Sequence, residues 1–219
     1  MFEAVIFDWD GTLADTRRVI IASFQRALRE VRCEVSEEFI ERRIGIGSAG
    51  TFREVLLSAK VHFDEELIAR LVAKKIQAEI ELSNEVKLFD GALAILESLQ
   101  GRVKLGLASM NNGDVINRML KVLNVEKFFP VVLTADDVSN SKPDPEIFLQ
   151  CALKLRSNPD KCVVVEDSIF GVKAAKAAGM GCIAVLTGFY SREELEKASP
   201  DLILNSLTEK REVLNFIFH

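Results

Sequence analysis

From Phe89 onward, short apolar runs alternate with segments whose apolar residues recur at helical spacing. Each run is continuously apolar, which is typical of strands in a parallel sheet that is covered on both faces. Strands that alternate with helices are the pattern of parallel crossover units. We expect strands at residues 103–108, 131–134, 162–165, 182–186 and 202–204. We expect helices at residues 90–99, with Asp90 as the cap, and at 114–123, 145–155 and 170–178.

An apolar strand at residues 3–7 belongs to the same sheet, but a long helical segment separates it from the other strands. In this segment we expect helices at residues 17–31, 36–44, 51–60 and 64–82, with caps at 15–16 and Ser36. The sequence therefore predicts an α/β protein whose core, residues 1–15 and 83–219, is a Rossmann-like, doubly wound parallel sheet. A helical-bundle cap domain, residues 16–82, is inserted after the first strand.

Composition excludes several classes of partner. Of the 219 residues, 48% are apolar and 28% are charged, which is typical of a soluble globular protein. The net charge of -5 is spread over mixed patches, so we expect neither nucleic acid nor membrane as a partner. Four cysteines without a CxxC pair indicate buried thiols rather than a zinc site. Met1 leads directly into a strand without a signal-peptide pattern, so we expect a cytoplasmic protein, either a monomer or a small homo-oligomer.

Two carboxylates, Asp8 and Asp10, follow the first strand. On a strand they would share one face, but Gly11 indicates that the chain is leaving the strand, so Asp10 can take a position of its own. Clustered carboxylates repel each other, and a divalent cation or a shared proton would hold them close at neutral pH. The pair predicts a nucleophile beside an acid/base. The alternative is a turn with an Asx cap.

Three further polar groups lie at the expected strand ends, where α/β sheets bind their ligands. Ser109 follows the second strand of the predicted sheet and precedes a helix whose N-terminal amides could bind an anion. Lys142 lies in the segment Ser-Lys-Pro-Asp-Pro, and Glu166 and Asp167 end another apolar strand. Taken singly, Ser109 could be a helix cap, Lys142 a solvated loop charge, and the two acids a helix cap. Because all four strand ends carry suitable residues, we interpret them together as one functional site.

In this order the four motifs resemble those of the haloacid dehalogenase superfamily of phosphotransferases, over essentially the whole chain. Residues 8–12 match the nucleophile motif, Ser109 the hydroxyl motif, Lys142 the lysine motif, and residues 166–167 the acidic motif. The insertion resembles the four-helix cap of the subgroup that includes phosphoglycolate phosphatases, β-phosphoglucomutases and a pyrophosphatase. Gly171 and residues 173–179 also resemble that subgroup.

The resemblance implies the chemical roles. Asp8 would attack phosphorus and form an aspartyl-phosphate. Asp10 would protonate the leaving oxygen and then deprotonate the attacking water. Mg²⁺ would be the cofactor, bound by the Asp8 carboxylate, the Asp10 backbone carbonyl and Asp167. Glu166 would be a further metal ligand or a water-mediated partner.

The resemblance also implies how the phosphate is held. The Ser109 hydroxyl and backbone amides near it and near Gly11 would hold the phosphate oxygens, while Lys142 would neutralise charge beside Asp8. The implied phosphate-binding residues are Gly11, Thr12, Ser109, Met110, Asn111 and Lys142.

Individual residues separate the activities of this superfamily. Asp10 favours phosphoryl transfer, because the dehalogenases lack an acid at that position. β-Phosphoglucomutases carry a histidine where this chain has Ile20 and an arginine where it has Ser48, which disfavours a mutase. We therefore predict a magnesium-dependent phosphatase for a small phosphorylated metabolite, with phosphoglycolate as the leading candidate. The alternatives are a phosphosugar mutase, a pyrophosphatase, and a regulatory phosphoacceptor or binding protein.

The glycine-rich segment at residues 45–50 is the predicted site of substrate selectivity, although a plain helix-to-helix turn is the alternative. Five arginines lie near it in the sequence, and we expect one of them to reach the substrate: Arg17, Arg18, Arg42, Arg43 or Arg53. The cap is expected to open and close about hinges at residues 15–16 and 83–84.

Overall fold

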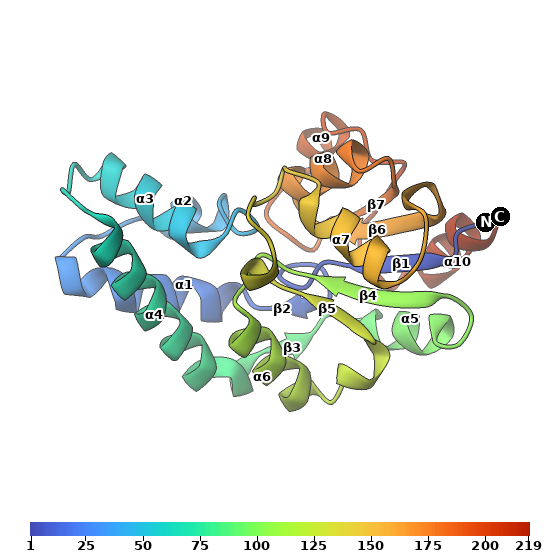
Figure 1. Cartoon of the computed structure of the whole chain (residues 1–219), viewed down its shortest axis with the longest axis horizontal. Helices are drawn as coiled ribbons and strands as arrows, with labels where there is room; N and C mark the ends of the chain where they lie inside the picture. The colour runs from blue at the N-terminus through green and yellow to red at the C-terminus, as the bar shows by residue number, and fades with distance from the viewer.

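The computed structural model describes all 219 residues, and its larger part is built on a six-stranded sheet (Figure 1). The strand order is β5-β4-β1-β6-β7-β8, and every neighbouring pair is parallel. The strands are β1 (Ala4–Phe7), β4 (Lys104–Ala108), β5 (Val131–Leu133), β6 (Cys162–Glu166), β7 (Gly181–Val185) and β8 (Leu202–Leu204). The predicted α/β fold is confirmed, with every sheet strand within one residue of its expected position.

Strand β1 lies at the point where the chain order of the sheet reverses. From β1 the chain adds β4 and β5 on one side, and it then crosses to add β6, β7 and β8 on the other. Ala4 is therefore in register with both Lys104 and Cys162. In open α/β sheets such a reversal leaves a crevice at the carboxyl ends of the strands, which is where ligands bind.

Helices cover both faces of the sheet. On β1, Val5 and Phe7 face one hydrophobic cluster and Ala4 and Ile6 face the other, as the two-residue period of a strand requires. The first cluster is closed by α5 (Ala92–Leu99), α6 (Gly113–Leu123) and α10 (Lys210–Phe218). The second is closed by α7 (Glu146–Lys154), α8 (Ile169–Ala177) and α9 (Arg192–Glu196). All four cysteines are free and buried, as predicted.

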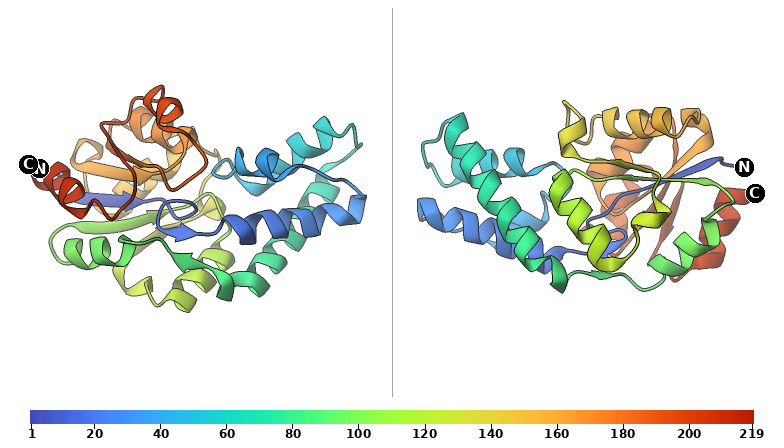
Figure 2. Two further views of the ribbon diagram at one scale, coloured as in Figure 1. Left: turned by 180° about the vertical axis from the view of Figure 1, so that it is seen from behind. Right: turned by 60° about the horizontal axis from the view of Figure 1, so that its bottom comes forward.

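The helical insertion, residues 17–82, extends away from the sheet (Figure 2). It contains α1 (Arg17–Leu28), α2 (Glu37–Glu41), α3 (Ser48–Ser58) and α4 (Glu65–Leu82). Its own cluster of 12 buried hydrophobic residues lies between Ile20 and Leu71 in the chain. A short antiparallel ribbon, β2 (Ala14–Asp15) with β3 (Lys87–Leu88), joins the two linkers that enter and leave it. The division into a core and an inserted cap stays a prediction, and the separate cluster supports it.

Two predicted helix starts are wrong for one reason. Helix α5 is preceded by Gly91 rather than capped by Asp90: Gly91 has a φ of +87°, and a Cβ there would lie 2.5 Å from the Leu207 backbone. Helix α3 begins at Ser48, since Gly47, at a φ of +90°, ends the preceding turn. In both cases a left-handed glycine supplies the start. The predicted glycine-rich loop therefore ends at Gly47, and its last three residues are helical.

Other local predictions have mixed outcomes. Ser36 caps α2 as predicted, accepting a hydrogen bond of 3.2 Å from the Phe39 amide, but the helix is shorter than expected. Thr16 precedes α1 without a capping bond from its side chain. The β2–β3 ribbon, α9 and α10 were not predicted. In α10 only Val213 and Ile217 are buried, and neighbouring apolar residues obscure their four-residue spacing. None of the helices combines the length and hydropathy that crossing a bilayer requires.

Candidate active site

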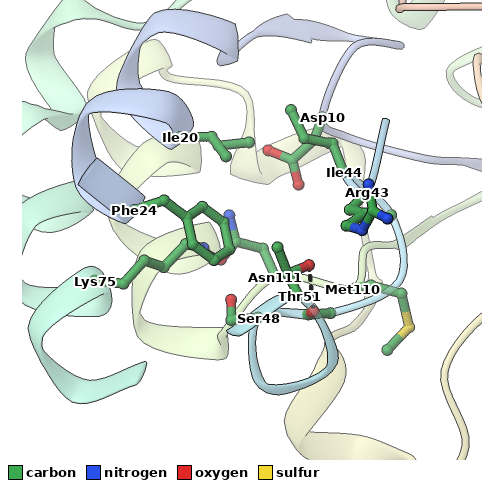
Figure 3. Close-up of a pocket in the computed structure, with 12 residues that line it drawn as sticks. Asp10, Ile20, Phe24, Arg43, Ile44, Ser48, Thr51, Lys75, Met110 and Asn111 are labelled. Atoms are coloured by element: carbon green, nitrogen blue, oxygen red, sulfur yellow. Dashed lines mark hydrogen bonds between the residues drawn. The ribbon is translucent and has the colours of Figure 1, made fainter. Parts of the chain in front are cut away.

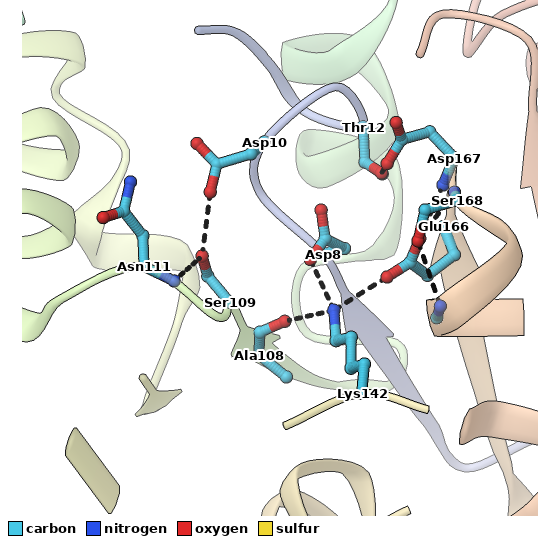
Figure 4. Close-up of polar contacts among 11 residues, drawn as sticks. Asp8, Asp10, Thr12, Ala108, Ser109, Asn111, Lys142, Glu166, Asp167 and Ser168 are labelled. Carbon is cyan, nitrogen blue, oxygen red and sulfur yellow. Dashed lines mark hydrogen bonds and ion pairs between the residues drawn. The ribbon is translucent and has the colours of Figure 1, made fainter. Parts of the chain in front are cut away.

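The polar residues predicted at four strand ends meet at one edge of the sheet (Figure 4). Asp8 directly follows β1, Ser109 directly follows β4, and Glu166 is the last residue of β6. Lys142 reaches the same place from the segment between β5 and α7. Since β4 and β6 both pair with β1, their carboxyl ends lie on either side of Asp8. The sheet topology thus brings these four residues together.

Lys142 lies at the centre of the site and is 2% exposed, so the alternative of a solvated loop charge is wrong. Its Nζ donates hydrogen bonds to Asp8 Oδ1 at 2.6 Å, Glu166 Oε1 at 2.7 Å and the Ala108 carbonyl at 3.3 Å. Burial alone would lower the pKa of Lys142, but the charges of Asp8 and Glu166 outweigh it and raise the pKa above its ordinary value. Lys142 therefore stays cationic and cannot act as a base.

Asp10 turns away from Lys142 and has its own partners. Ser109 Oγ donates to Asp10 Oδ2 at 3.0 Å and accepts from the Asn111 amide at 3.0 Å. The other oxygen, Asp10 Oδ1, is buried without a hydrogen-bond partner. Burial raises the pKa of the Asp10 carboxyl, against the opposing charge of Lys75. A carboxyl in this state can carry a proton or accept one, which suits an acid/base.

Three acids form a cluster in which one oxygen from each lies within 4.8 Å of the others: Asp8, Glu166 and Asp167. Glu166 is fully engaged, since Oε1 accepts from Lys142 and Oε2 accepts from Ser168 Oγ and from the amides of residues 167 and 168. Burial, followed by the charge of Glu166, raises the pKa of Asp167. Burial also raises the pKa of Asp8 well above its ordinary value, although Lys142 opposes the change. One ammonium does not balance three carboxylates.

A divalent cation with a preference for oxygen fits this cluster. Asp8 Oδ1 is bonded to Lys142 and Asp167 Oδ1 accepts from Thr12 Oγ at 3.0 Å, so each acid keeps an oxygen without a hydrogen bond within the protein. Asp167 is pressed between two glycines, where a Cβ on Gly11 or Gly188 would lie 2.4 or 1.9 Å from its Oδ2. Hard cations such as Mg²⁺ take ligand sets of this kind. The Asp10 carboxylate is not part of the cluster, so only its backbone carbonyl remains as a predicted ligand.

The backbone amides around Asp8 divide into engaged and free groups. Three predicted phosphate-binding amides already have acceptors, namely Gly11 N on the Ala14 carbonyl, Thr12 N on the Trp9 carbonyl and Asn111 N on Ser109 Oγ. The amide of Met110, which is also a predicted phosphate-binding residue, makes no hydrogen bond within the protein, and neither do the amides of Trp9 and Asp10. Buried amides need an acceptor, and convergent amides form anion-binding concavities. Only Met110 belongs to both the predicted and the free amides, because whether an amide is free depends on the hydrogen bonds of the folded turn and not on the motif.

Sequence reasoning missed two charged residues of α4 near the site. Lys75 and Glu79 form an ion pair of 2.7 Å, and their side chains are 3% and 0% exposed. Lys75 Nζ donates to Asn111 Oδ1 at 3.2 Å, and Asn111 Nδ2 donates to Glu79 Oε1 at 3.3 Å. The available signal was the position of Lys75 four residues after Leu71, on the buried stripe of the helix. A charge on an apolar stripe is a reason to look for a partner.

A pocket lies between the strand ends and the helical insertion (Figure 3). Asp10, Met110 and Asn111 line it from the core. The insertion contributes Ile20 and Phe24 of α1, Lys75 of α4, and residues of the segment from Arg43 to Thr51. The predicted selectivity segment therefore does face the site.

The five arginines near that segment have different contacts. Arg43 is the one that lines the cavity, and its Nε donates to Glu54 at 2.5 Å. Three others pair with carboxylates: Arg17 with Glu41, Arg42 with Glu194, and Arg53 with Glu65. Arg18 is exposed. That one of them contacts substrate stays a prediction.

Fold and site together define an α/β enzyme that places carboxylates, a lysine, a hydroxyl and free amides around one point. The family model for haloacid dehalogenase-like hydrolases matches residues 5–185. The chain belongs to this family, as its motifs predicted.

The chain is also similar over its length to individual members of the family. A phosphorylated carbohydrates phosphatase from Thermotoga maritima is 33% identical over 215 residues, or 94% of this chain and 99% of the relative. Pyrophosphatase PpaX from Bacillus pumilus is 32% identical over 207 residues, or 94% and 93%. The crystal structure of β-phosphoglucomutase from Clostridium difficile has a TM-score of 0.87 at 26% identity and covers 100% of both chains. The chain is thus a phosphatase-like or phosphomutase-like hydrolase that acts on phosphorylated compounds.

Proposed function

We propose that this chain is a magnesium-dependent phosphatase that hydrolyses a small phosphorylated metabolite through an aspartyl-phosphate. The observation that carries the proposal is the separation of the two aspartates. Asp8 lies against Lys142, whereas Asp10 lies against Ser109 and keeps one buried oxygen without a partner. One acid is thus placed beside a cation that offsets its negative charge, and the other is free to exchange a proton.

In the first step, a carboxylate oxygen of Asp8 attacks phosphorus and the bond from phosphorus to the leaving oxygen breaks. Asp10 gives its proton to that oxygen, and its raised pKa keeps a protonated fraction available. Ser109 fixes the Asp10 carboxyl through Oδ2, so Oδ1 is the oxygen that exchanges the proton. The products of this step are the aspartyl-phosphate and the free alcohol.

In the second step, Asp10 takes a proton from a water molecule that attacks the phosphorus of the aspartyl-phosphate. The bond from phosphorus to the Asp8 oxygen breaks, and inorganic phosphate and the Asp8 carboxylate are formed. Throughout, Lys142 and the three free amides offset negative charge near the phosphoryl oxygens. Asp10 therefore serves both steps, as acid and then as base.

We propose that Asp8, Asp167 and the Asp10 carbonyl hold Mg²⁺, and that Glu166 positions Lys142 and the turn after β6. The contacts of Glu166 support this division, because both of its oxygens are occupied by protein donors. When bound, the cation would neutralise charge on the acids and on the phosphoryl group.

The substrate has several candidates. Phosphoglycolate is the candidate that the start of the cap favoured in the sequence, and the Thermotoga relative raises a phosphorylated carbohydrate as another. Ile20 and Ser48, at the positions where mutases carry a histidine and an arginine, both line the cavity, which disfavours mutase chemistry. A regulatory phosphoacceptor is disfavoured by Asp10, since this residue supplies the base that clears the intermediate.

Replacement of Asp8 tests the proposal. Asp8→Asn should lower kcat/KM for p-nitrophenyl phosphate in Mg²⁺ by about 10³-fold or more, because an amide cannot attack phosphorus. The matched control is Asp160→Asn, an exposed aspartate far from the site, which should retain full activity. Asp10→Asn should slow turnover severely while preserving the fold.

Retained activity in Asp8→Asn would show that the nucleophile is wrong. The proposed phosphatase function would be refuted if the unaltered protein released no phosphate from any of four kinds of substrate: p-nitrophenyl phosphate, phosphoglycolate, pyrophosphate and sugar phosphates. Isomerised sugar phosphate without released phosphate would instead establish a mutase.

A further inference from the structure

We propose that Glu79 is a positioning residue that sets substrate preference, because it cancels the charge of Lys75. The site would then select a phosphate ester of a neutral molecule that bears hydroxyl groups. Esters that carry a carboxylate or a second phosphate would be disfavoured. The inference rests on the proposed phosphatase function, because it concerns the leaving-group side of the same site.

Lys75 is the most enclosed cation in the cavity wall. Its side chain is 3% exposed, and its Nζ lies 2.7 Å from Glu79 Oε2 and 5.3 Å from the centre of the Phe24 ring. Glu79 lies behind this wall, with 0% of its side chain exposed. It therefore acts on a ligand through Lys75 and Asn111, which both contact it and line the cavity.

The pair contributes no net charge to the cavity. If Lys75 is an ammonium and Glu79 a carboxylate, their charges cancel at 2.7 Å. If the proton lies on Glu79 instead, both groups are neutral. A cationic Lys75 beside a protonated Glu79 would be a buried unpaired charge, which is the costly arrangement. A lysine that would otherwise attract an anion is thus balanced from within the same helix.

The remaining charges in the cavity do not favour an anion either. Arg43 is the other cation that lines it, and Arg43 is paired with Glu54 at 2.5 Å. Across the cavity lies the Asp10 carboxyl. A carboxylate or a second phosphate on the substrate would lose its hydration without meeting an unpaired cation, and this desolvation is costly.

A hydroxylated molecule meets suitable groups on the insertion side. Ser48 Oγ makes no hydrogen bond within the protein, and Thr51 Oγ, which donates to the Gly47 carbonyl at 3.0 Å, can still accept one. Ile20 and Phe24 supply apolar surface beside them. Binding sites of this kind, with a few polar groups among apolar ones, suit small uncharged ligands.

The experiment compares a sugar monophosphate, glucose 6-phosphate, with phosphoglycolate. The unaltered protein should have the higher kcat/KM for glucose 6-phosphate. Glu79→Gln should raise kcat/KM for phosphoglycolate relative to glucose 6-phosphate by about tenfold, mainly through a lower KM for phosphoglycolate, because it leaves Lys75 uncompensated. Glu81→Gln is the matched control: it lies on the same helix, its partner Arg26 is exposed, and the ratio should not change.

A second variant separates charge from structure. Lys75→Gln combined with Glu79→Gln keeps the pair neutral and should retain the preference for the sugar phosphate, with folding checked by circular dichroism. The inference is overturned if the unaltered protein prefers phosphoglycolate, if Glu79→Gln changes the ratio no more than Glu81→Gln does, or if the double variant shifts as Glu79→Gln does. Failure of the phosphatase proposal is distinct, since p-nitrophenyl phosphate would then not be hydrolysed at all.

Discussion

The sheet core and the helical insertion face the same cavity but contribute different kinds of groups. The core contributes charged side chains bound to each other across long stretches of chain, such as Lys142 to Asp8, 134 residues apart. The insertion contributes apolar side chains and cations that are already balanced by nearby acids, such as Lys75 by Glu79 and Arg43 by Glu54. This difference supports our proposal that the core carries out the phosphoryl chemistry and that the insertion selects the molecule that carries the phosphate.

The two regions also differ in how they are held. The core has hydrophobic clusters of 28 and 22 buried residues, and the insertion has one of 12. Polar contacts between the regions include Arg42 with Glu194 at 2.6 Å, the Tyr190 hydroxyl with the Arg42 carbonyl at 2.8 Å, and Lys75 with Asn111 at 3.2 Å. Apolar contacts join the regions as well, since Val19 of α1 lies in the 28-residue cluster and Ile76, Ile80 and Leu82 of α4 pack against it. We propose that the insertion nevertheless opens about its two linkers.

The largest expected effect comes from a substitution that destabilises the hydrophobic cluster of the insertion but leaves the clusters of the core intact. Phe52 is fully buried in the insertion, with its ring centre 4.7 Å from that of Phe24. Phe52→Ala should lower the free energy of unfolding by about 3–5 kcal/mol. Hydrogen exchange should show faster exchange in α1, α3 and α4 and unchanged protection in β1, β4 and β6. The matched core variant is Phe148→Ala, which should increase exchange around the sheet instead. Equal loss of protection in both regions after Phe52→Ala would mean that they unfold as one unit.

Magnesium should act on the core alone. At a concentration 100 times its Kd, Mg²⁺ should stabilise the protein by about 2.7 kcal/mol, and excess EDTA should remove both this stabilisation and the phosphatase activity. Thermal unfolding with and without Mg²⁺ measures the effect. Asp167→Asn should abolish the Mg²⁺-dependent shift in Tm, whereas Glu81→Gln in the insertion should retain it. An undiminished shift in Asp167→Asn would place the cation elsewhere.

The smallest expected effect concerns the contact between the regions. Arg42 and Glu194 are 40% and 32% exposed, so Glu194→Gln should cost about 0.2–1 kcal/mol of stability. It should also speed trypsin cleavage near residues 42–43 and raise KM modestly, and high salt should remove the difference. Glu193→Gln, on the same helix but bonded to Ser191, is the control. Mg²⁺ with a phosphate analogue should slow cleavage in the unaltered protein, and identical cleavage with and without them would contradict closure of the insertion.

Much of the core could be predicted because its signals are local. Continuous apolar runs identified the strands, and the residues that end them identified most of the candidate site, since parallel strands bring their carboxyl ends to one edge. The helix starts at Gly47 and Gly91 could not be assigned in this way, because a glycine there matters only once the chain adopts a left-handed turn. Lys75 and Glu79 could not be predicted as site residues for a related reason. Helical spacing places both residues on α4, but it does not show which face of the helix contacts Asn111.

The sequence by itself determined the α/β pattern, the place of the helical insertion, and the acids, hydroxyl and lysine at the strand ends. Each of these depends on residue type and short spacing, which the chain carries before it folds. Only the tertiary structure decided that Asp8 and Asp10 have separate partners, that Glu166 is fully engaged, and that Glu79 balances Lys75. These depend on side chains from distant segments meeting in a buried space, where a hydrogen bond or a charge partner changes what each group can do.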